Sequence, residues 1–465
     1  MALEGIESEI FAIGIGECGS NLLGSYLARS NRGELPHRIR EYLIMNTDRG
    51  DLLKARKKYS ISSKRTLLYS DAEIGVGGKF AAGYDAVLNS EDIVLNQLQS
   101  LGYEGISGFI LLTSFGGGTG CGGTPALIRL LRKRFAEQEK RKIFIYVFGV
   151  LPFLNQSSEA VNSVWALSKL LRLQLEEDNM GPDLILLLSN RTMLERVLSM
   201  QRGEAVDLLS RQTGEDLSNL STSKTSGPMQ TASPLGGVLG GVNSTQIPHM
   251  EEAFVELVNP LALESIAEML SPGVPEVGKE VLPTTDIGDF ALKLDSVVVP
   301  AMFDDLAIFP EVGGVGSQLS TAVEYTAGHG SLTEMGTNPS ASSVFSVLSG
   351  PREIARVEFD PLLKKALSPF LAKGASISPT YCAYDDDDAR ASLLLLFGLP
   401  RIPELYDILQ EAKALIDLHS GSSELKQHWF QRSKGTTRGA LVSAVDDLEK
   451  LFGYYITPDQ KTSNE

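Results

Sequence analysis

The chain has 465 residues, 43% of them hydrophobic, which allows two or three globular domains. Its 42 basic and 58 acidic residues give a net charge of −16, which disfavours nucleic acid and anionic membrane as main partners. No apolar run approaches the ~18 to 20 residues of a membrane span, and no signal-peptide pattern is found. The three cysteines are Cys18, Cys121 and Cys382, and their spacing fits neither a disulfide framework nor a zinc site. We therefore expect a protein of the reducing cytoplasm, without metal ligands of its own.

Five apolar runs alternate with helical patterns in the first two hundred residues, near Ile10, Tyr42, Gly108, Ile143 and Asp183. This alternation predicts right-handed βαβ crossovers and a parallel sheet, that is, a Rossmann-like α/β domain. Polar and glycine-rich loops follow these runs. Because parallel strands all end at the same edge of a sheet, we expect the loops to converge there.

The first glycine loop follows the run IFAIGI and has the pattern GxGxxGxN, with Gly14, Gly16, Gly19 and Asn21. The second apolar run, YLIMNTD, ends in Asn46, Thr47 and Asp48. Taken singly, the first loop indicates a dinucleotide-binding fold. An acid at the end of the second strand holds a ribose hydroxyl in such folds, and Asp48 has that position, so an oxidoreductase stays open here.

A third glycine loop, EIGVGGKFAAG, contains Gly75, Gly77, Gly78 and Gly83. Three such loops would surround a polyphosphate from several sides, whereas a dehydrogenase needs only one. The set therefore favours a nucleoside triphosphate. No GxxxxGK[ST] sequence occurs, which excludes a P-loop and leaves Mg²⁺ and backbone dipoles to neutralise the phosphate charge.

The segment SFGGGTGCGG (residues 114–123) is the most specific motif of the chain. It follows the apolar run FILLT and opens a predicted helix over residues 124–139. Its glycines leave backbone N–H groups unshielded where the helix dipole favours negative charge, so the loop is predicted to bind phosphate. A side chain at Gly118 should then block the approach of the phosphate. A glycine hairpin would instead lead into another alternating strand.

These motifs resemble those of the tubulin/FtsZ superfamily, whose signature GGGTG[ST]G is matched over residues 116–122 with Cys121 in place of the hydroxyl residue. The resemblance covers roughly the first two hundred residues. It implies a fold with a Rossmann-like GTPase domain, a central helix and a second α+β domain, and it implies GTP or GDP with Mg²⁺ as ligands. The residues that it places at the nucleotide are Gly16, Glu17, Cys18, Gly19, Asn21, Asn46, Asp48, Gly77, Gly78, Gly116, Gly117, Gly118, Thr119 and Gly120.

The resemblance also implies contacts with the ribose and the base. Glu159 matches a ribose-binding glutamate, with Asn162 behind it on the helix, although an exposed helix-start glutamate is an alternative. Asn190, after the run DLILLLS, matches the asparagine that binds guanine. On the following central helix, Phe254 would stack on the base and Asn259 would add a polar group, although the family spacing is one residue shorter and Phe254 could equally belong to the core.

In this family an acidic loop, NxDxxD or NxDxxE, follows the central helix and acts on the nucleotide of the neighbouring subunit. TTDIGDF (residues 284–290) aligns with it, which makes Asp286 and Asp289 the catalytic acids and puts Thr284 in the place of asparagine. The alternative is a helix cap with a first-turn acid. A competing match, NPLALE, has Leu261 at its first acidic position.

The predicted organisation has five parts. Residues 1–202 and 246–272 form the nucleotide-binding domain with the central helix, and residues 203–245, rich in Ser, Thr and Gly, form a flexible insertion. The catalytic loop and the start of the next helix take residues 273–294. A C-terminal α+β domain takes residues 295–455, with strands VFSVLSG, SPTYCAY and ASLLLLFGLP and two amphipathic helices. Residues 456–465 form a short tail.

The expected function is that of a cytoplasmic GTPase that polymerises head to tail. Its main partner is a second copy of itself; accessory division or shape proteins are possible partners, and a membrane would be contacted only through an adaptor. One alternative is a nucleotide-binding structural filament with little hydrolysis, suggested by Thr284 and by the altered signature. A Rossmann-type oxidoreductase is the less favoured alternative.

Overall fold

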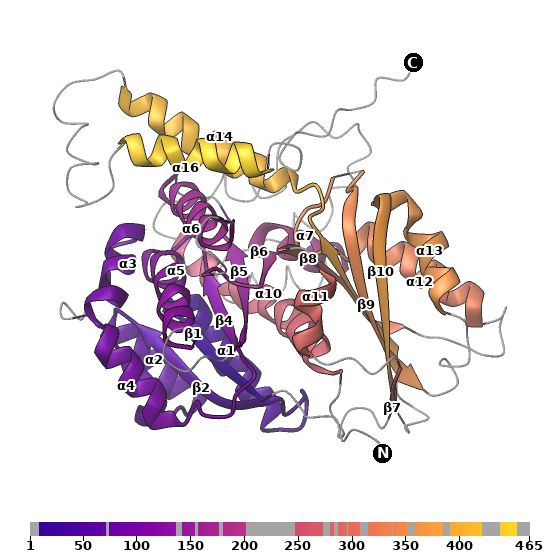
Figure 1. The fold of residues 1–465 in the computed structure, drawn as a ribbon, viewed down its shortest axis with the longest axis horizontal. Helices are drawn as coiled ribbons and strands as arrows, with labels where there is room; N and C mark the ends of the chain where they lie inside the picture. Colours follow the sequence, from indigo (N-terminus) through magenta and orange to yellow (C-terminus); the bar gives the residue numbers. More distant parts are fainter. Residues whose placement is uncertain are drawn as a thin grey trace.

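A computed structural model describes residues 9–70, 74–135, 142–153, 157–175, 180–200, 247–272, 280–282, 287–294, 296–306, 315–336, 338–351, 359–384, 391–420 and 438–452. Within these residues eleven strands form one sheet in the order β3-β2-β1-β4-β5-β6-β8-β11-β9-β10-β7 (Figure 1). The strands are β1 (Ile10–Ile15), β2 (Ile39–Asn46), β3 (Thr66–Leu68), β4 (Gly108–Ser114), β5 (Phe144–Leu151), β6 (Leu184–Ser189), β7 (Glu280–Leu282), β8 (Val297–Leu306), β9 (Ala341–Pro351), β10 (Leu371–Tyr384) and β11 (Ala391–Gly398).

Helices cover the sheet on both faces (Figure 1). They are α1 (Gly16–Ser30), α2 (Arg49–Tyr59), α3 (Phe80–Asn89), α4 (Glu91–Leu101), α5 (Gly118–Lys133), α6 (Ser157–Leu175), α7 (Asn190–Met200), α10 (Ile247–Leu270), α11 (Phe290–Lys293), α12 (Val315–His329), α13 (Phe359–Leu367), α14 (Pro403–Ser420) and α16 (Arg438–Phe452).

The first six strands of this order are all parallel, as the sequence predicts. Strand β1 shows why: its six residues are all buried, and alternate side chains enter two different cores, with Phe11 and Ile13 on one face and Ile10 and Ala12 on the other. Complete burial of a strand on both faces is the mark of a parallel sheet between two helix layers. Each fully buried Leu, Ile or Phe contributes about 1.5–3 kcal/mol to folding.

Helix α5 begins at Gly118, six residues before the predicted start at residue 124. Because glycine has a low intrinsic helix propensity, the prediction from sequence assigned these glycines to a loop. In the structure this first turn is buried against α3, so tertiary packing outweighs the propensity. The predicted residues 136–139 of this helix lie outside the described residues.

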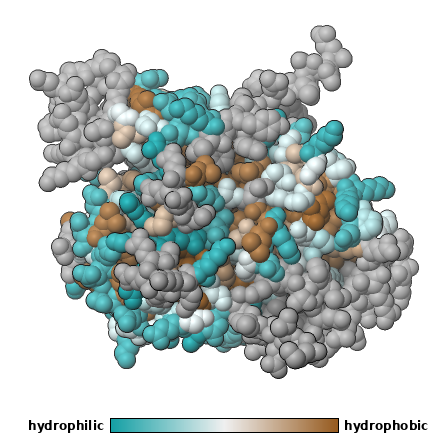
Figure 2. Space-filling model, viewed as in Figure 1, coloured by the Kyte–Doolittle hydropathy of each residue, from teal (hydrophilic) through white to brown (hydrophobic). Residues whose placement is uncertain are grey.

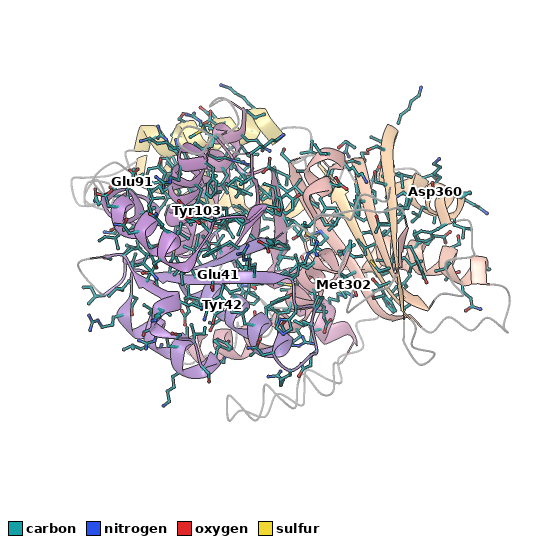
Figure 3. The ribbon with its side chains drawn as sticks, turned by 60° about the horizontal axis from the view of Figure 1, so that its bottom comes forward. Glu41, Tyr42, Glu91, Tyr103, Met302 and Asp360 are labelled. Atoms are coloured by element: carbon teal, nitrogen blue, oxygen red, sulfur yellow. The ribbon has the colours of Figure 1, made fainter. Side chains whose placement is uncertain are left out.

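The C-terminal strands extend the same sheet. Strand β8 pairs with β6 in parallel at Val297 and Val298 and with β11 in antiparallel fashion, while β9 pairs with both β11 and β10. Helices α12 and α13 share an apolar core with these strands. The three predicted strands are confirmed as β9, β10 and β11. In the view of Figure 3, Glu41 and Tyr42 on β2, Met302 on β8 and Asp360 on α13 mark the course from the N-terminal half to the C-terminal layer.

Helix α10 is the predicted central helix and lies between the two halves (Figure 1). It contacts α1 and α7 in the N-terminal half and β8, β9 and β11 in the other. Near its C-terminal end, Glu268 accepts hydrogen bonds from the hydroxyls of Ser349 (2.8 Å) and Ser392 (2.5 Å). These bonds fix one end of α10 to β9 and β11. The predicted flexible insertion, residues 203–245, lies outside the described residues.

Helices α14 and α16 pack on α6 (yellow, above α6 in Figure 1). Their apolar faces, with Leu405, Leu409, Leu441 and Ala444, belong to the same core as Phe11 of β1. These two helices of the predicted C-terminal domain therefore cover part of the N-terminal half. In Figure 2 the coloured surface of the N-terminal half is mainly hydrophilic, and hydrophobic residues show between these in separate spots. Within the described part of the chain, no helix has both the length and the apolar character needed to cross a bilayer.

Candidate nucleotide-binding site

The candidate site lies at the carboxyl ends of β1, β2, β4, β5 and β6. Cross-strand pairs Gly14–Leu112, Ser114–Val150 and Leu151–Ser189 show that these parallel strands end level with one another. Helices α1 and α5 begin directly at this edge. Because the first N–H groups of a helix have no partner within it, two such N-termini side by side form a site that attracts an anion.

The first loop is the beginning of α1, and the signature loop is the beginning of α5. The first turn of α1 holds Gly16, Glu17, Cys18 and Gly19, and the next turn holds Asn21, whose Oδ1 accepts a hydrogen bond from the Tyr59 hydroxyl (3.4 Å). Burial, and then the neighbouring Glu17, raise the pKa of the Cys18 thiol to about 12. The thiol therefore stays protonated at neutral pH and is a poor nucleophile.

The second and signature loops meet through two threonines. The hydroxyls of Thr47 and Thr119 lie 2.6 Å apart, although 72 residues separate them in sequence. The Asp48 side chain caps α2 by accepting from the N–H of Asp51 (3.1 Å). The Asn46 Oδ1 accepts from the N–H of Asp48 (3.0 Å), while its Nδ2 is buried with no partner among the described residues. A buried donor without an acceptor is costly, so Nδ2 fits a site completed by ligand oxygens.

The third loop packs directly on the signature loop. The Gly75 N–H donates to the Thr47 carbonyl (3.1 Å), and Gly78 has a φ of 67°, which favours glycine. A Cβ on Gly118 would overlap the Lys79 nitrogen and lie 2.7 Å from the Gly78 carbonyl carbon. The sequence predicted that a side chain at Gly118 would block a phosphate. The structure adds a second obstacle to a side chain at this position, because the third loop lies against Gly118; the contact of Gly118 with phosphate stays a prediction.

Asn162 connects the third and signature loops. Its Nδ2 donates to the carbonyls of Gly78 (2.8 Å) and Gly116 (2.7 Å), and its Oδ1 accepts from the Phe80 N–H (3.2 Å). The side chain is buried. Asn162 therefore joins the third loop to the signature loop, and its predicted contact with the nucleotide stays a prediction. Glu159, three residues earlier on α6, is half-buried beside Gly116, and its predicted contact with the ribose stays a prediction.

The cysteine in the signature motif points into the protein. Cys121 is fully buried in the core, and its Sγ lies 3.6 Å from the Gly118 carbonyl oxygen. Burial raises the pKa of this thiol. A small apolar thiol therefore fits where the family motif has a hydroxyl, because the side chain at this position faces the core. Gly117 is the N-cap of α5, and Thr119 and Gly120 lie in its first turn.

The structure describes only some of the side chains that are predicted to contact the base. Asn190 is the first residue of α7, at the same sheet edge as the glycine loops, and its side chain is partly exposed. Asn259 is partly exposed on α10, next to buried Val258. The side chain of Phe254 lies outside the described residues. Their predicted roles toward the base therefore stay predictions.

The described part of the predicted catalytic segment, residues 287–290, is anchored near the amino ends of the sheet strands, away from the glycine loops. Asp286 and Thr284 lie outside the described residues, while Asp289 is partly buried at the end of a short 3₁₀ turn, Ile287–Asp289. The Tyr146 hydroxyl donates to the Ile287 carbonyl (2.6 Å) and accepts from the Ala291 N–H (3.2 Å). Tyr146 stands near the start of β5, five residues before its carboxyl end, which is about 17 Å along a strand.

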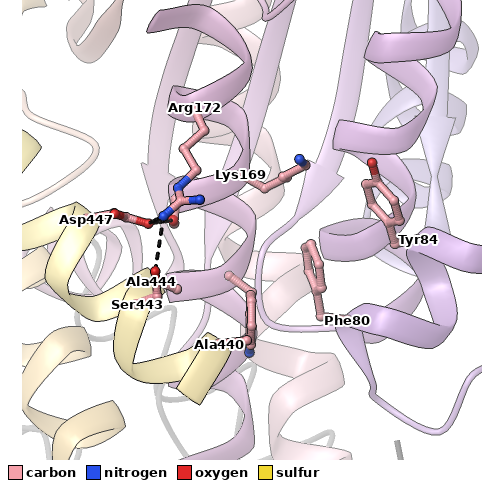
Figure 4. A pocket seen from close by; sticks show the side chains of 10 residues that line it. Phe80, Tyr84, Lys169, Arg172, Ala440, Ser443, Ala444 and Asp447 are labelled. Carbon is pink, nitrogen blue, oxygen red and sulfur yellow. Dashed lines mark hydrogen bonds and ion pairs between the residues drawn. The ribbon is translucent and has the colours of Figure 1, made fainter. Parts of the chain in front are cut away.

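The structure also contains a pocket of about 290 Å³ that sequence analysis did not predict (Figure 4). It lies between α3, α6 and α16, and helices line it rather than the glycine loops. The Phe80 and Trp165 rings stack 5.6 Å apart at an angle of 17°. Arg172, at its rim, donates to Ser443 (3.1 Å) and pairs with Asp447. Through Phe80, this pocket adjoins the Asn162 hydrogen bonds.

The comparisons with known proteins agree with the motifs and the fold. Residues 9–196 match the family model described as "Tubulin/FtsZ family, GTPase domain". A protein of Pyrococcus horikoshii, "Tubulin-like protein CetZ", is 28% identical over 166 residues, which cover 35% of this chain and 41% of that protein. The matched region thus spans about two fifths of that relative's length. The resemblance to the tubulin/FtsZ superfamily is confirmed.

Two solved structures share the fold over most of the chain. CetZ from Methanosaeta thermophila superposes with a TM-score of 0.62 at 17% identity and covers 96% of this chain and 99% of its own. CetZ2 from Haloferax volcanii, described as a GTPγS-bound protofilament, has a TM-score of 0.59 at 15% identity, with 88% and 99% covered. The fold is therefore that of the tubulin-like CetZ proteins, and the predicted fold class is confirmed.

Proposed function

We propose that this protein binds GTP and GDP at the carboxyl edge of its sheet and polymerises head to tail. In this proposal Asp286 and Asp289 of one subunit complete GTP hydrolysis on the nucleotide of the next. The observation that carries the proposal is the placement of Asp289. It lies at the edge of the sheet opposite to the phosphate-binding loops, so it is poorly placed to reach its own nucleotide and well placed to meet that of a neighbour.

The loop geometry supports phosphate binding. The N-termini of α1 and α5 lie side by side, and three sets of hydrogen bonds hold the loops around them. These are the bond between the Thr47 and Thr119 hydroxyls, the bond from the Gly75 N–H to the Thr47 carbonyl, and the bonds of the Asn162 amide. Backbone N–H groups held in this way need no lysine to bind phosphate. The buried Nδ2 of Asn46 offers a further donor. A Mg²⁺ ion would accompany the phosphates, taking most of its ligands from phosphate and water.

Glu159 and Asn190 would bind the ribose and the base. Both follow strands whose ends reach the same sheet edge, and both have side chains that are only partly buried. A carboxylate accepts from ribose hydroxyls, and an amide both donates to and accepts from a purine edge. The relative described as a GTPγS-bound protofilament supports both the nucleotide class and self-association. We also propose a cytoplasmic location, with accessory proteins or a membrane adaptor as secondary partners.

Extraction of nucleotide from the purified protein tests the first part of the proposal. GDP or GTP released on denaturation, at close to one per chain, is the expected result. Recovery of NAD(P) would favour the oxidoreductase instead. Electron microscopy with GTP and with GDP then tests polymerisation, and filaments that form only with GTP are expected.

A structural filament with little hydrolysis is the second candidate. Thr284 replaces the asparagine of the acidic loop, and a hydroxyl has fewer hydrogen-bonding atoms than an amide with which to orient water. Filaments that form with GTP but release no phosphate would support this candidate. Restoration of hydrolysis by Thr284→Asn would show that the threonine is the cause.

A further inference from the structure

A buried carboxyl group from a distant helix caps the first turn of α7. The Ser189 hydroxyl accepts from the Thr192 N–H (3.1 Å), which makes Ser189 the N-cap of α7, and it donates to Oε1 of Glu404 (2.6 Å). The Thr192 hydroxyl donates to Oε2 of the same carboxyl (3.4 Å). In an ordinary capping box the third helical residue supplies the acid. Here that residue is Thr192, and the acid comes from α14, more than two hundred residues later.

Asn190, between Ser189 and Arg191, is held on both sides. The Arg191 guanidinium donates to Asp407 on α14 (3.1 Å) and to Glu334 (2.9 Å). On the strand side, the Ser189 N–H donates to the Leu332 carbonyl (2.8 Å). The backbone of Asn190 therefore cannot turn without breaking contacts to α14 or to the segment before β9.

Glu404 is the centre of this arrangement. Its side chain has no exposed surface, and it is the second residue of α14, so the carboxyl lies at the N-termini of both α14 and α7. Both helix dipoles favour its negative charge. Burial opposes ionisation and raises the pKa of Glu404 to about 7, while Arg191 and Ser189 act in the opposite direction. A buried carboxyl that accepts hydrogen bonds from two hydroxyls of the same helix turn restricts the positions of both.

We propose that Glu404 is a positioning residue for base recognition: it fixes the first turn of α7 so that Asn190 presents its amide to the purine of the nucleotide. This inference rests on the proposed function, in which Asn190 binds guanine. The expected consequence is that Glu404 controls discrimination between bases, although it never touches the nucleotide. Binding of the phosphates should not depend on it, because within the described residues the hydrogen bonds of Glu404 go to Ser189 and Thr192 and not to the glycine loops.

The test compares the dissociation constants of GTP and ATP for four proteins by titration calorimetry: wild type, Glu404→Ala, Glu404→Gln and Glu411→Ala. Glu404→Ala should reduce the preference for GTP over ATP by about tenfold, the effect of one to two lost hydrogen bonds. Glu404→Gln keeps an acceptor for Ser189 and should retain most of the preference. Glu411, on the exposed side of α14, is the matched control and should leave both constants unchanged.

A double-mutant cycle with Asn190→Ala separates positioning from a general structural role. If Glu404 acts through Asn190, adding Glu404→Ala to Asn190→Ala should not lower the preference further. Equal weakening of GTP binding and ATP binding by Glu404→Ala, or a full additive loss in the double variant, would overturn the inference.

If Glu404→Ala fails to fold, Ser189→Ala, which removes the same connection, should show a smaller loss of the preference for GTP. A wild-type protein that binds no GTP overturns both the proposed function and this inference. One that prefers GTP equally with and without Glu404 overturns only the inference.

Discussion

Replacement of Asn162 by alanine should cost GTP affinity without unfolding the protein. The Asn162 amide makes three hydrogen bonds, to Gly78, Gly116 and the N–H of Phe80, and all three join segments that are distant in sequence. Each is worth about 1 kcal/mol net, so the arrangement of the two loops loses about 3 kcal/mol. This free energy holds the loops in place before the nucleotide arrives. If binding must restore the arrangement, affinity for GTP should fall by about a hundredfold.

Titration calorimetry with GTP measures this loss, and circular dichroism confirms that the fold is intact. Ser163→Ala is the matched control. Ser163 is the next residue on α6 and is also buried, but among the described residues its hydroxyl donates to the Glu159 carbonyl within the same helix (2.9 Å) and joins no loops. The control should bind GTP nearly as well as the wild type. An Asn162→Ala protein that binds GTP within threefold of wild type would show that the two loops do not depend on this residue.

Two further predictions follow from the site and from Glu404. Gly118→Val should weaken GTP binding and also lower thermal stability, since its side chain would overlap the Lys79 nitrogen; overpacking of this kind costs about 1–3 kcal/mol, and a melting temperature equal to wild type would contradict it. The pKa of Glu404 rises from 4.5 to about 7 on folding, so the native state binds the proton more tightly than the unfolded state. The free energy of unfolding should therefore fall as pH rises from about 4.5 to 7, by about 3 kcal/mol in total, and stay level above it. Urea titrations across this range should show the fall in wild type and a flatter profile in Glu404→Gln; identical profiles would contradict the account.

Local patterns of the sequence predicted the sheet edge and its loops. The apolar run IFAIGI and the glycines that follow it are adjacent in sequence. The apolar pattern of the strand and the glycine pattern of the turn were therefore enough to predict the junction of β1 and α1. The same holds for β4 and α5, apart from the early start of α5 at Gly118. That start depends on burial of the glycine turn against α3, a tertiary contact that propensity does not contain.

Long-range contacts could not be predicted in this way. No pattern near Asn162 in the sequence indicated that its amide would donate to backbone carbonyls 84 and 46 residues away. The carboxyl of Glu404 meets Ser189 across 215 residues, and nothing near Glu404 in sequence distinguishes it from a first-turn acid of α14. The packing of α14 and α16 on α6, and the pocket beneath α16, depend on contacts of the same kind.

The rate of GTP hydrolysis per molecule, measured against protein concentration, tests the central claim most directly. If Asp289 acts across a subunit junction, the specific rate of wild type should rise steeply above a threshold concentration. Asp289→Ala should bind GTP normally, assemble into longer-lived filaments and hydrolyse GTP about 10²- to 10⁴-fold more slowly. A specific rate that stays constant with concentration, or an Asp289→Ala variant that hydrolyses GTP like wild type, would contradict the shared site.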